Sequence, residues 1–293
     1  MPTISYIAEK MELIANPYDD VQVATNKFKM RQRFFENGVP SPRYMLDDEN
    51  IDDKNLHYPL IVKPVDRSGS LGVLKIDKHH DLADAVNRAK KESFTQRAII
   101  EEYVSGMEVS VEAISWEGVH YILAITDKVT TEAPYFVEVA HHQPCQRSNS
   151  IQEKIKAETV KALSSLHIRY GASHSEFKIN NKGEIFIIEV GARMGGDFIG
   201  SHLVQLSTGY DFLKGVIDIS LGHFEIPVQD KKNSSGVYFL CEETKHLLPY
   251  IKNAGDYHEI VEAAITDDKI RPVQSSADRS GYFIYQGNKR FLL

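Results

Sequence analysis

In the first half of the chain, segments with hydrophobic residues at the spacing of a helix alternate with segments whose hydrophobic residues are typical of a strand. Aromatic and methionine side chains form a rough apolar face that predicts a helix over 25–37, ended by Gly38 and the prolines after it. The apolar run YPLIVKPV predicts a buried strand at 58–65, which would form a hairpin with a short strand at 73–76. The same patterns predict a helix over 80–92 and strands over 98–103, 106–116 and 121–126.

The second half opens on a segment without a clear period, residues 128–149, for which we expect a long functional loop. Apolar residues at helical spacing then predict a helix over 151–168. Two strands, 173–179 and 184–190, follow and are joined by Asn-Asn-Lys-Gly, a strong hairpin signal. The rest of the chain predicts helices near 199–206 and 210–221 and short strands and turns over 226–293.

The hairpin at 173–190 carries the most informative polar residues. A turn at 181–182 would place Glu176 opposite Ile187, with Glu189 diagonally across on the same face. Diagonal neighbours in a sheet lie about 7–8 Å apart, so the two glutamates could lean toward one cation, and Mg²⁺ prefers such oxygen ligands. The alternative is two solvated glutamates on an exposed face. We expect a core face of Phe177, Ile179, Phe186 and Ile188, and a polar face of His174, Glu176, Lys178 and Glu189.

Three further segments could bind an anion or a nucleotide. Arg193, in the turn at 191–197, suits bidentate binding of a phosphate or carboxylate. The turn at 66–72 lacks a Walker A signature, but its glycines and serines could bring N–H groups and the preceding Lys63 to a phosphate; the alternative is a plain hairpin turn. The strand end at 101–104 could offer backbone groups to a base, and a later carboxylate could hold ribose hydroxyls, although exposed glutamates are common.

The composition is that of an ordinary globular protein and argues against several other classes of protein. The chain has 293 residues, 42% of them hydrophobic and 26% charged, which are ordinary globular values. A net charge of −7 and a pI near 6.0 argue against a dedicated nucleic-acid binder. The sequence contains neither an apolar run of about 18 residues nor a secretory signal, so we expect no membrane span and a cytoplasmic location. Two cysteines predict neither a disulfide framework nor a zinc site.

Together and in this order, the motifs resemble the ATP-grasp superfamily of carboxylate–amine ligases over about residues 20–290. The resemblance implies an α/β fold in which two α+β lobes clamp ATP. It implies that Glu176 and Glu189 hold Mg²⁺ or Mn²⁺ and that Arg193 steadies the acyl-phosphate and the tetrahedral intermediate. It assigns the nucleotide to Lys27 and Lys63 (phosphates), to Ser68, Gly69, Ser70 and Gly72 (lid), to Glu101, Glu102 and Val104 (adenine) and to Glu108 (ribose).

The chain departs from the family pattern at two positions. Asn26 replaces the usual aspartate before the first lysine, and Gly191 replaces a frequent third metal ligand, which puts a second metal site in doubt. Within the superfamily, the closest resemblance is to L-amino acid ligases, whose substrate loop carries a Glu-x-x-His pair that is matched here by Glu138 and His141. Asp197 would join them at the substrate end. The alternative is that His141 is a solvated loop residue.

The resemblance also implies a domain organisation. It predicts a remnant or linker with the first helix at 1–39, a small lobe at 40–105, a large lobe at 106–225 and a C-terminal subdomain at 226–293. Relatives begin with a Rossmann-like domain of about 100 residues, and this chain starts near its end, so we expect a naturally short form or a cut one. A homodimer, or a partner that supplies the missing domain, would then complete the substrate site.

The expected reaction is ATP-dependent activation of a small-molecule carboxylate as an acyl-phosphate, followed by attack of an amine. Such chemistry needs positioning and charge neutralisation rather than a protein nucleophile. Two rival classes remain open at this point. One is a bicarbonate-using carboxylase or carbamoyl-phosphate-type enzyme, and the other is a non-catalytic nucleotide-binding module.

Overall fold

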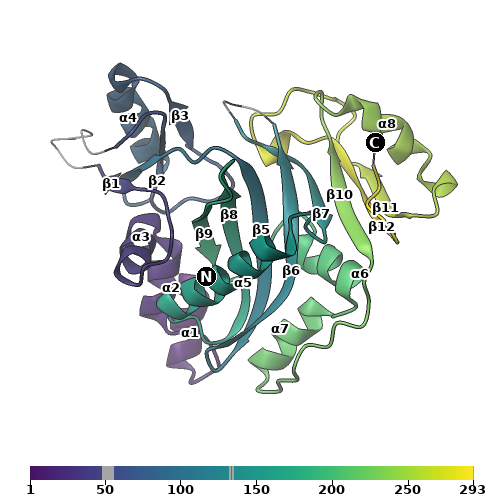
Figure 1. Cartoon of the computed structure of the whole chain (residues 1–293), viewed down its shortest axis with the longest axis horizontal. Coiled ribbons are helices and arrows are strands. Elements are labelled where there is room, and N and C mark those ends of the chain that lie inside the picture. Colours follow the sequence, from purple (N-terminus) through teal and green to yellow (C-terminus); the bar gives the residue numbers. More distant parts are fainter. Residues whose placement is uncertain (48–55, 132, 134, 293) are drawn as a thin grey trace.

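The strands of the protein form two antiparallel sheets. The computed structural model describes residues 1–47, 56–131, 133 and 135–292. Figure 1 shows the small sheet standing to one side of the large one. The small sheet has the order β1 (Tyr44–Leu46), β4 (Ala98–Glu102), β2 (Leu60–Pro64), β3 (Leu74–Ile76). The large sheet has the order β11 (Ile260–Ile265), β12 (Gly281–Gly287), β10 (Ser234–Leu240), β7 (Glu138–Gln143), β6 (Val119–Thr130), β5 (Met107–Trp116), β8 (Gly171–Ile179), β9 (Ile185–Gly191).

The small sheet is covered on one face by helix α4 (Leu82–Glu92), which follows a single turn, η2 (His79–Asp81). The helix buries the apolar stripe that its sequence predicted, with Leu82 and Val86 packed against Leu60 and Val62 of β2. The predicted hairpin of β2 and β3 is confirmed, with Leu60 paired to Ile76. Apolar burial of this kind contributes about 25 cal/mol per Å² and holds the unit together.

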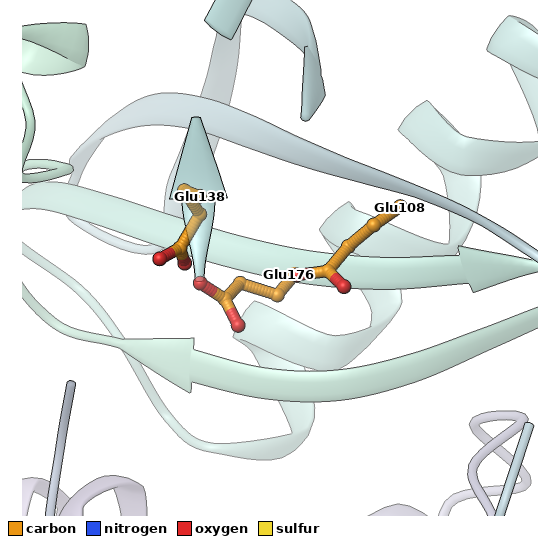
Figure 2. A group of neighbouring side chains, drawn as sticks. All are labelled: Glu108, Glu138 and Glu176. Carbon is orange, nitrogen blue, oxygen red and sulfur yellow. The ribbon is translucent and has the colours of Figure 1, made fainter. Parts of the chain in front are cut away.

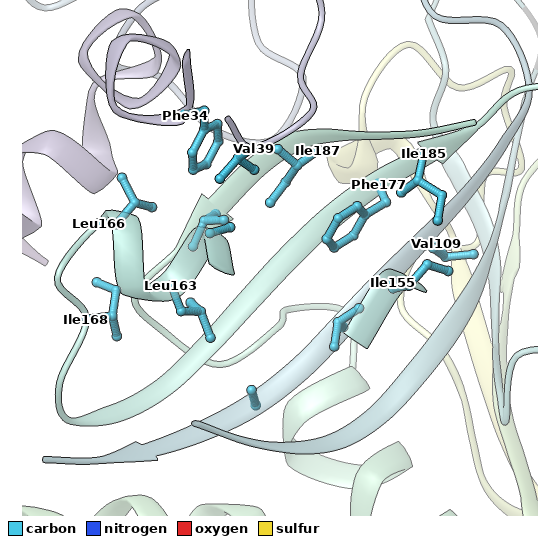
Figure 3. Close-up of a cluster of buried hydrophobic side chains, with 14 of the residues drawn as sticks. Phe34, Val39, Val109, Ile155, Leu163, Leu166, Ile168, Phe177, Ile185 and Ile187 are labelled. Carbon is cyan, nitrogen blue, oxygen red and sulfur yellow. The ribbon is translucent and has the colours of Figure 1, made fainter. Parts of the chain in front are cut away.

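The large sheet packs against helix α5 (Asn149–Ser165), which Ser148 caps by accepting a bond from the Ile151 N–H. Figure 3 shows this core: Ile155 and Leu163 of α5 lie over Phe177 of β8 and Ile187 of β9. Helices α2 (Tyr18–Thr25) and α3 (Lys27–Glu36) pack on the same core through residues that include Phe34. The predicted helices at 25–37 and 151–168 are therefore confirmed with slightly different ends.

Other short helices lie outside these two cores. They are α1 (Pro2–Lys10), η3 (Ile199–Leu203), α6 (Val204–Thr208), α7 (Phe212–Ser220), η4 (Lys245–Leu247), α8 (Leu248–Lys252), η5 (Ala254–Asp256) and η6 (Ser276–Asp278). The pattern missed α1, α2 and α8, because each is short and its apolar residues do not repeat at a helical spacing for long enough to be recognised. No helix in the described part of the chain is both long and apolar enough to cross a membrane.

The prediction of one long loop at 128–149 was wrong. Strand β6 runs on to Thr130, β7 occupies Glu138–Gln143 between β6 and β10, and α5 begins at Asn149. Strand β7 has no alternating pattern because both of its faces are covered, so its polar residues are as buried as its apolar ones. Residues 132 and 134, within the predicted loop, lie outside the described residues.

The predicted register of the β8–β9 hairpin was also wrong. Glu176 lies directly opposite Glu189 rather than opposite Ile187 for two reasons. Next to the turn the strands already pair one residue away from the predicted register, with Phe177 opposite Ile187, and β9 then contains one extra residue, Ile188, at a bulge. Between the turn and the bulge, the core face therefore carries Ile185 and Ile187 instead of Phe186 and Ile188. The polar face was predicted correctly, since His174, Glu176, Lys178 and Glu189 all line one cavity.

The C-terminal strands continue the large sheet without a break. Strand β10 pairs with β7, and β12 and β11 extend the sheet beyond it. Figure 1 shows this part and α8 on the side of the molecule away from the small sheet. The division of the chain into lobes at residues 40, 106 and 226 stays a prediction.

Candidate active site

A cavity of about 750 Å³ opens where the two sheets face each other. It is built from the even-numbered side of β5, because the odd-numbered residues of that strand point into the core under α5. The predicted site residues that line it are Lys27, Lys63, Ser68, Gly69, Ser70, Glu101, Glu102, Val104, Glu108, Glu138, His141, Glu176, Glu189, Arg193 and Asp197. Gly72 lies outside the lining; a Cβ there would come within 3.0 Å of the Pro64 side chain.

Two buried lysines stand on the wall of the cavity. Lys27 begins α3; its Nζ lies 3.3 Å from Glu189 and also donates to the Arg67 carbonyl. Lys63 lies one residue before the end of β2, with its Nζ 2.7 Å from Glu101. Burial lowers the pKa of Lys63, and the attraction of Glu101 only partly offsets this effect. Both amines are placed to meet an anion in the cavity.

Arg31, on α3, is a residue that the pattern did not single out. Its side chain is fully buried; Nε lies 2.8 Å from Glu101, and Nη2 donates to the Ile188 carbonyl at 2.6 Å. Burial alone would raise the pKa of Glu101, but Arg31 and Lys63 outweigh it and the pKa is lowered. The Glu101 carboxylate is thus engaged by two cations, and its predicted contact with adenine stays a prediction.

The segment 102–104, between β4 of the small sheet and β5 of the large sheet, contains a backbone N–H group without an acceptor among the described residues. The Glu102 N–H donates to the Arg43 carbonyl, and the Tyr103 N–H donates to the Pro59 carbonyl. In the described part of the chain, the Val104 N–H has no acceptor, and Val104 lines the cavity. This donor could serve a flat heteroaromatic ring, as the sequence predicted.

The glycine-rich turn forms the rim of the cavity. Ser68, Gly69 and Ser70 are exposed, and Gly69 and Ser70 have positive φ angles of 67° and 56°. A left-handed backbone of this kind favours glycine and turns successive N–H groups away from the sheet. The turn could therefore cover an anion that Lys27 and Lys63 hold.

Three carboxylates converge on the floor of the cavity. Figure 2 shows Glu108, Glu138 and Glu176 approaching one another from β5, β7 and β8; one oxygen from each lies within 4.8 Å of the others. Lys128 of β6, which the pattern did not single out, holds them together. Its Nζ lies 2.9 Å from Glu108, 2.9 Å from Glu176 and 3.3 Å from Glu138.

Strand register explains this cluster. Glu108 lies opposite Lys128 on one side and opposite Lys178 on the other, with Lys178 Nζ at 2.9 Å. Burial would lower the pKa of Lys128, but the surrounding carboxylates outweigh it and hold the pKa well above its usual range. The pKa of Glu176 is correspondingly held well below its usual range, although burial alone would raise it. The floor therefore stays charged across the physiological pH range.

The carboxylates suit a hard divalent cation. Mg²⁺ is bound in proteins by one or two carboxylates together with substrate phosphates and water. Glu176 and Glu189 lie side by side across the β8–β9 bulge, and Glu189 is held by Lys27 at 3.3 Å. The residues present thus fit such an ion, with Glu108 and Glu138 as neighbours of Glu176.

The far end of the cavity is built by β7 and the turn after β9. A bulge at Val139 breaks the alternation of β7, so Glu138 and His141 both face the cavity despite their odd spacing. His141 is buried, with its Nε2 3.5 Å from Asp197, so the alternative of a solvated loop histidine was wrong. Burial lowers the pKa of His141, against the opposing effect of Asp197.

Asp197 is itself held from the C-terminal part of the chain. Arg279, another residue that the pattern missed, places Nη2 at 2.9 and 3.1 Å from its two oxygens. Burial would raise the pKa of Asp197, but His141 and Arg279 outweigh it and lower it to about 2. Arg193 is exposed on the same turn and donates through Nη1 to the Met194 carbonyl at 2.7 Å. Arg193 is therefore the cation at this end that faces solvent.

His142 provides a test of pH dependence away from this cavity. It is buried on the opposite face of β7, where its Nδ1 lies 3.0 Å from the Tyr285 hydroxyl. Burial lowers the pKa of His142 from 6.5 to about 3. Between these values the unfolded chain binds a proton that the folded chain lacks, so this contribution to stability is complete above pH 6.5 and is lost as pH falls.

We therefore expect the free energy of unfolding in urea to decrease as pH falls from 6.5 toward 3. One such histidine accounts for a slope of up to about 1.4 kcal/mol per pH unit, and His142→Phe should flatten the curve by part of that amount. His258→Asn, at an exposed histidine, is the control and should leave the slope unchanged. Parallel curves for His142→Phe and the parent would contradict the prediction.

Comparison with known proteins matches this arrangement to one family. Residues 56–201 match the model of an ATP-grasp domain. The chain is 26% identical over 277 residues to alanine–anticapsin ligase of Bacillus subtilis, covering 84% of this chain and 58% of the relative. It is 26% identical over 198 residues to D-alanine–D-alanine ligase B of Chromobacterium violaceum, covering 63% of this chain and 64% of the relative. The chain thus spans about three fifths of these curated relatives.

A solved structure shares the fold over nearly the whole chain. The L-amino acid ligase from Bacillus licheniformis superposes with a TM-score of 0.80 at 23% identity, covering 99% of this chain and 73% of that one. The motif match, the cavity between two sheets and this superposition agree with one another. With its ATP-grasp domain at residues 56–201, the chain belongs to the ATP-grasp superfamily.

Proposed function

We propose that this protein is an ATP- and Mg²⁺-dependent ligase that activates a small-molecule carboxylate as an acyl-phosphate and joins it to an amine, with amino acids as substrates. The observation that carries the proposal is that buried lysines, a carboxylate cluster and Arg193 line one continuous cavity. The similarity to alanine–anticapsin ligase and to an L-amino acid ligase supports the choice of substrate class.

The nucleotide would lie along the small sheet. The Val104 N–H, which has no acceptor within the described residues, would donate to the adenine, and Lys27 and Lys63 would meet the phosphates beneath the turn at 68–70. Glu176 and Glu189 would hold Mg²⁺, which neutralises phosphate charge during the transfer. Lys128 keeps the neighbouring carboxylates in position before the ion binds.

The substrates would meet at the end formed by β7 and the turn at 191–197. Arg193 can bind the incoming carboxylate and the charge that develops on the acyl group. Arg279 contacts both oxygens of Asp197, at 2.9 and 3.1 Å, whereas Lys128 contacts Glu138 at 3.3 Å, so Glu138 is the better partner for the ammonium of an amino acid. His141, buried beside it, could take a proton from the attacking amine, since a neutral imidazole is a general base near neutral pH.

The direct test is phosphate release from ATP and Mg²⁺, screened over pairs of amino acids, with the products identified by mass spectrometry. We expect release that requires two amino acids and yields a dipeptide. Release that depends on bicarbonate would instead support a carboxylase. Nucleotide binding without release under any mixture would support a binding module and would overturn the proposal.

Lys63→Met should weaken ATP binding. The ammonium of Lys63 is buried at the cavity wall, and a charge-assisted hydrogen bond is worth about 1.5–3 kcal/mol. Calorimetry of the variant should show a loss of this size, whereas Lys156→Met, on the exposed face of α5, is the control. An ATP affinity equal to that of the parent would remove Lys63 from the phosphate site.

A further inference from the structure

Glu112 of β5 is fully buried beside the cavity and has no part in the proposed reaction. One of its oxygens pairs with Nδ1 of His174, which lies opposite it on β8. The other oxygen accepts the backbone N–H of Gly195 at 2.9 Å. Both oxygens of this carboxylate are therefore occupied, one by a strand and one by the turn that carries Arg193.

His174 also contacts Glu176, one of the two carboxylates that we assign to the metal. Its second nitrogen, Nε2, lies 3.2 Å from Oε1 of Glu176, and the ring is buried. Because ionised carboxylates only accept hydrogen bonds, both ring nitrogens act as donors here. His174 thus orients the carboxylate that we assign to Mg²⁺, while Glu112 orients His174.

Gly195 shows how closely the turn packs on this pair. A Cβ at Gly195 would lie 2.7 Å from Oε1 of Glu112 and 2.8 Å from Nδ1 of His174, distances that side chains do not tolerate. The turn at 191–197 therefore lies directly on the Glu112–His174 pair. Any displacement of the pair would move the turn, and with it Arg193.

We propose that Glu112 is a positioning residue that couples the metal-binding carboxylate Glu176 to the turn carrying Arg193, through His174 on one side and the Gly195 N–H on the other. This inference rests on the proposed function. Its physical basis is that groups behind metal ligands fix their orientation, and the loss of such a group costs about 10–100-fold in metal affinity or activity.

Glu112→Gln is the sharpest change, because it keeps the size of the side chain. Glutamine has one acceptor oxygen and one NH₂ group, whereas His174 and Gly195 both present donors to residue 112. The contact with Gly195 can be kept by the amide oxygen, but the contact with His174 is kept only if Nδ1 gives up its proton and accepts from the NH₂ group, so the charge-assisted pair with residue 112 is lost in either case. We expect Mn²⁺ to bind the enzyme–ADP complex at least about tenfold more weakly, measured by calorimetry and by the electron paramagnetic resonance of free Mn²⁺.

Two further readouts separate positioning from general damage. The affinity for ADP without metal and the KM for ATP should stay at the parent value while kcat falls about tenfold or more. His120→Gln is the matched control: this histidine lies on the neighbouring strand β6, bonded to Ser115 and Ser164, and does not line the cavity. It should leave Mn²⁺ affinity and kcat unchanged.

Gly195→Ala disturbs the same contact between Glu112 and the turn, but from the turn. It can replace Glu112→Gln as the test if that variant does not fold. Its methyl group should displace the pair and weaken Mn²⁺ binding, although the atoms nearest to it belong to Glu112 and His174 and not to a proposed ligand. Glu112→Ala removes the clash with Oε1 and also removes the partner that holds Nδ1 of His174 in place, so the ring can move away from the methyl group. The double variant should therefore be no weaker than Glu112→Ala alone, and the two effects should not add.

The outcomes distinguish this inference from the proposed function. If the parent enzyme fails to bind Mn²⁺ with ADP, the proposed function is wrong and the inference falls with it. If the parent binds the metal and turns over, but Glu112→Gln and Gly195→Ala match it in Mn²⁺ affinity and kcat, only the inference is overturned. Additive losses in the double variant would also overturn the coupling.

Discussion

Arg193→Ala is expected to slow ligase turnover about 10²–10³-fold, the usual effect of removing one donor that stabilises developing negative charge. Arg193 is the solvent-facing cation at the substrate end of the cavity, since Arg279 is already paired with Asp197. The affinity for ADP should stay at the parent value, because the two phosphate-facing lysines lie on the other wall. Single-turnover phosphate release and calorimetry measure the two quantities.

The control for this prediction is Arg169→Ala, an exposed arginine outside the cavity. It should keep the parent rate. If Arg193→Ala also turned over at the parent rate, Arg193 would not contact the reacting groups. The proposed placement of the substrates at the end formed by β7 and the turn at 191–197 would then be wrong.

Lys128→Met is expected to destabilise the fold by up to about 3 kcal/mol, the lower end of the cost of breaking a buried ion pair, because the three carboxylates that lose this buried cation are themselves only partly buried. Among the described residues, Lys128 is in ion pairs with Glu108, Glu138 and Glu176, whereas Lys178 is paired with Glu108 alone. Lys178→Met makes the same change in side-chain size and should therefore lower the free energy of unfolding by less. Urea unfolding of both variants and the parent measures the difference.

Magnesium provides a second arm of the same experiment. With Lys128 removed, the three carboxylates lie within 4.8 Å of one another without a cation between them. Mg²⁺ alone should then raise the melting temperature of Lys128→Met more than that of the parent or of Lys178→Met. An equal response of all three proteins would mean that these carboxylates do not form the floor of a cation site.

Local signals were sufficient for much of the fold. The hairpin at 60–76, the Asn-Asn-Lys-Gly turn and the helices α4 and α5 follow from apolar spacing and from caps within a few residues. Nearly all of the site residues that the family motifs predicted line the cavity. Gly72 is the exception, since it packs against Pro64 and Glu92 rather than lining the site.

The sequence by itself therefore determined the order of the longer helices and of the two hairpins, and the chemical types at the site, because these depend on neighbours along the chain. Only the tertiary structure decided the two bulges, at Val139 and Ile188, which bring Glu138 to the side of His141 and Glu176 opposite Glu189. A bulge is stabilised by partners far away in sequence, as when the Ile188 carbonyl accepts from Arg31 on α3. Lys128 and Glu112 were hidden for the same reason: a buried charge is understood only from the groups that other strands place around it.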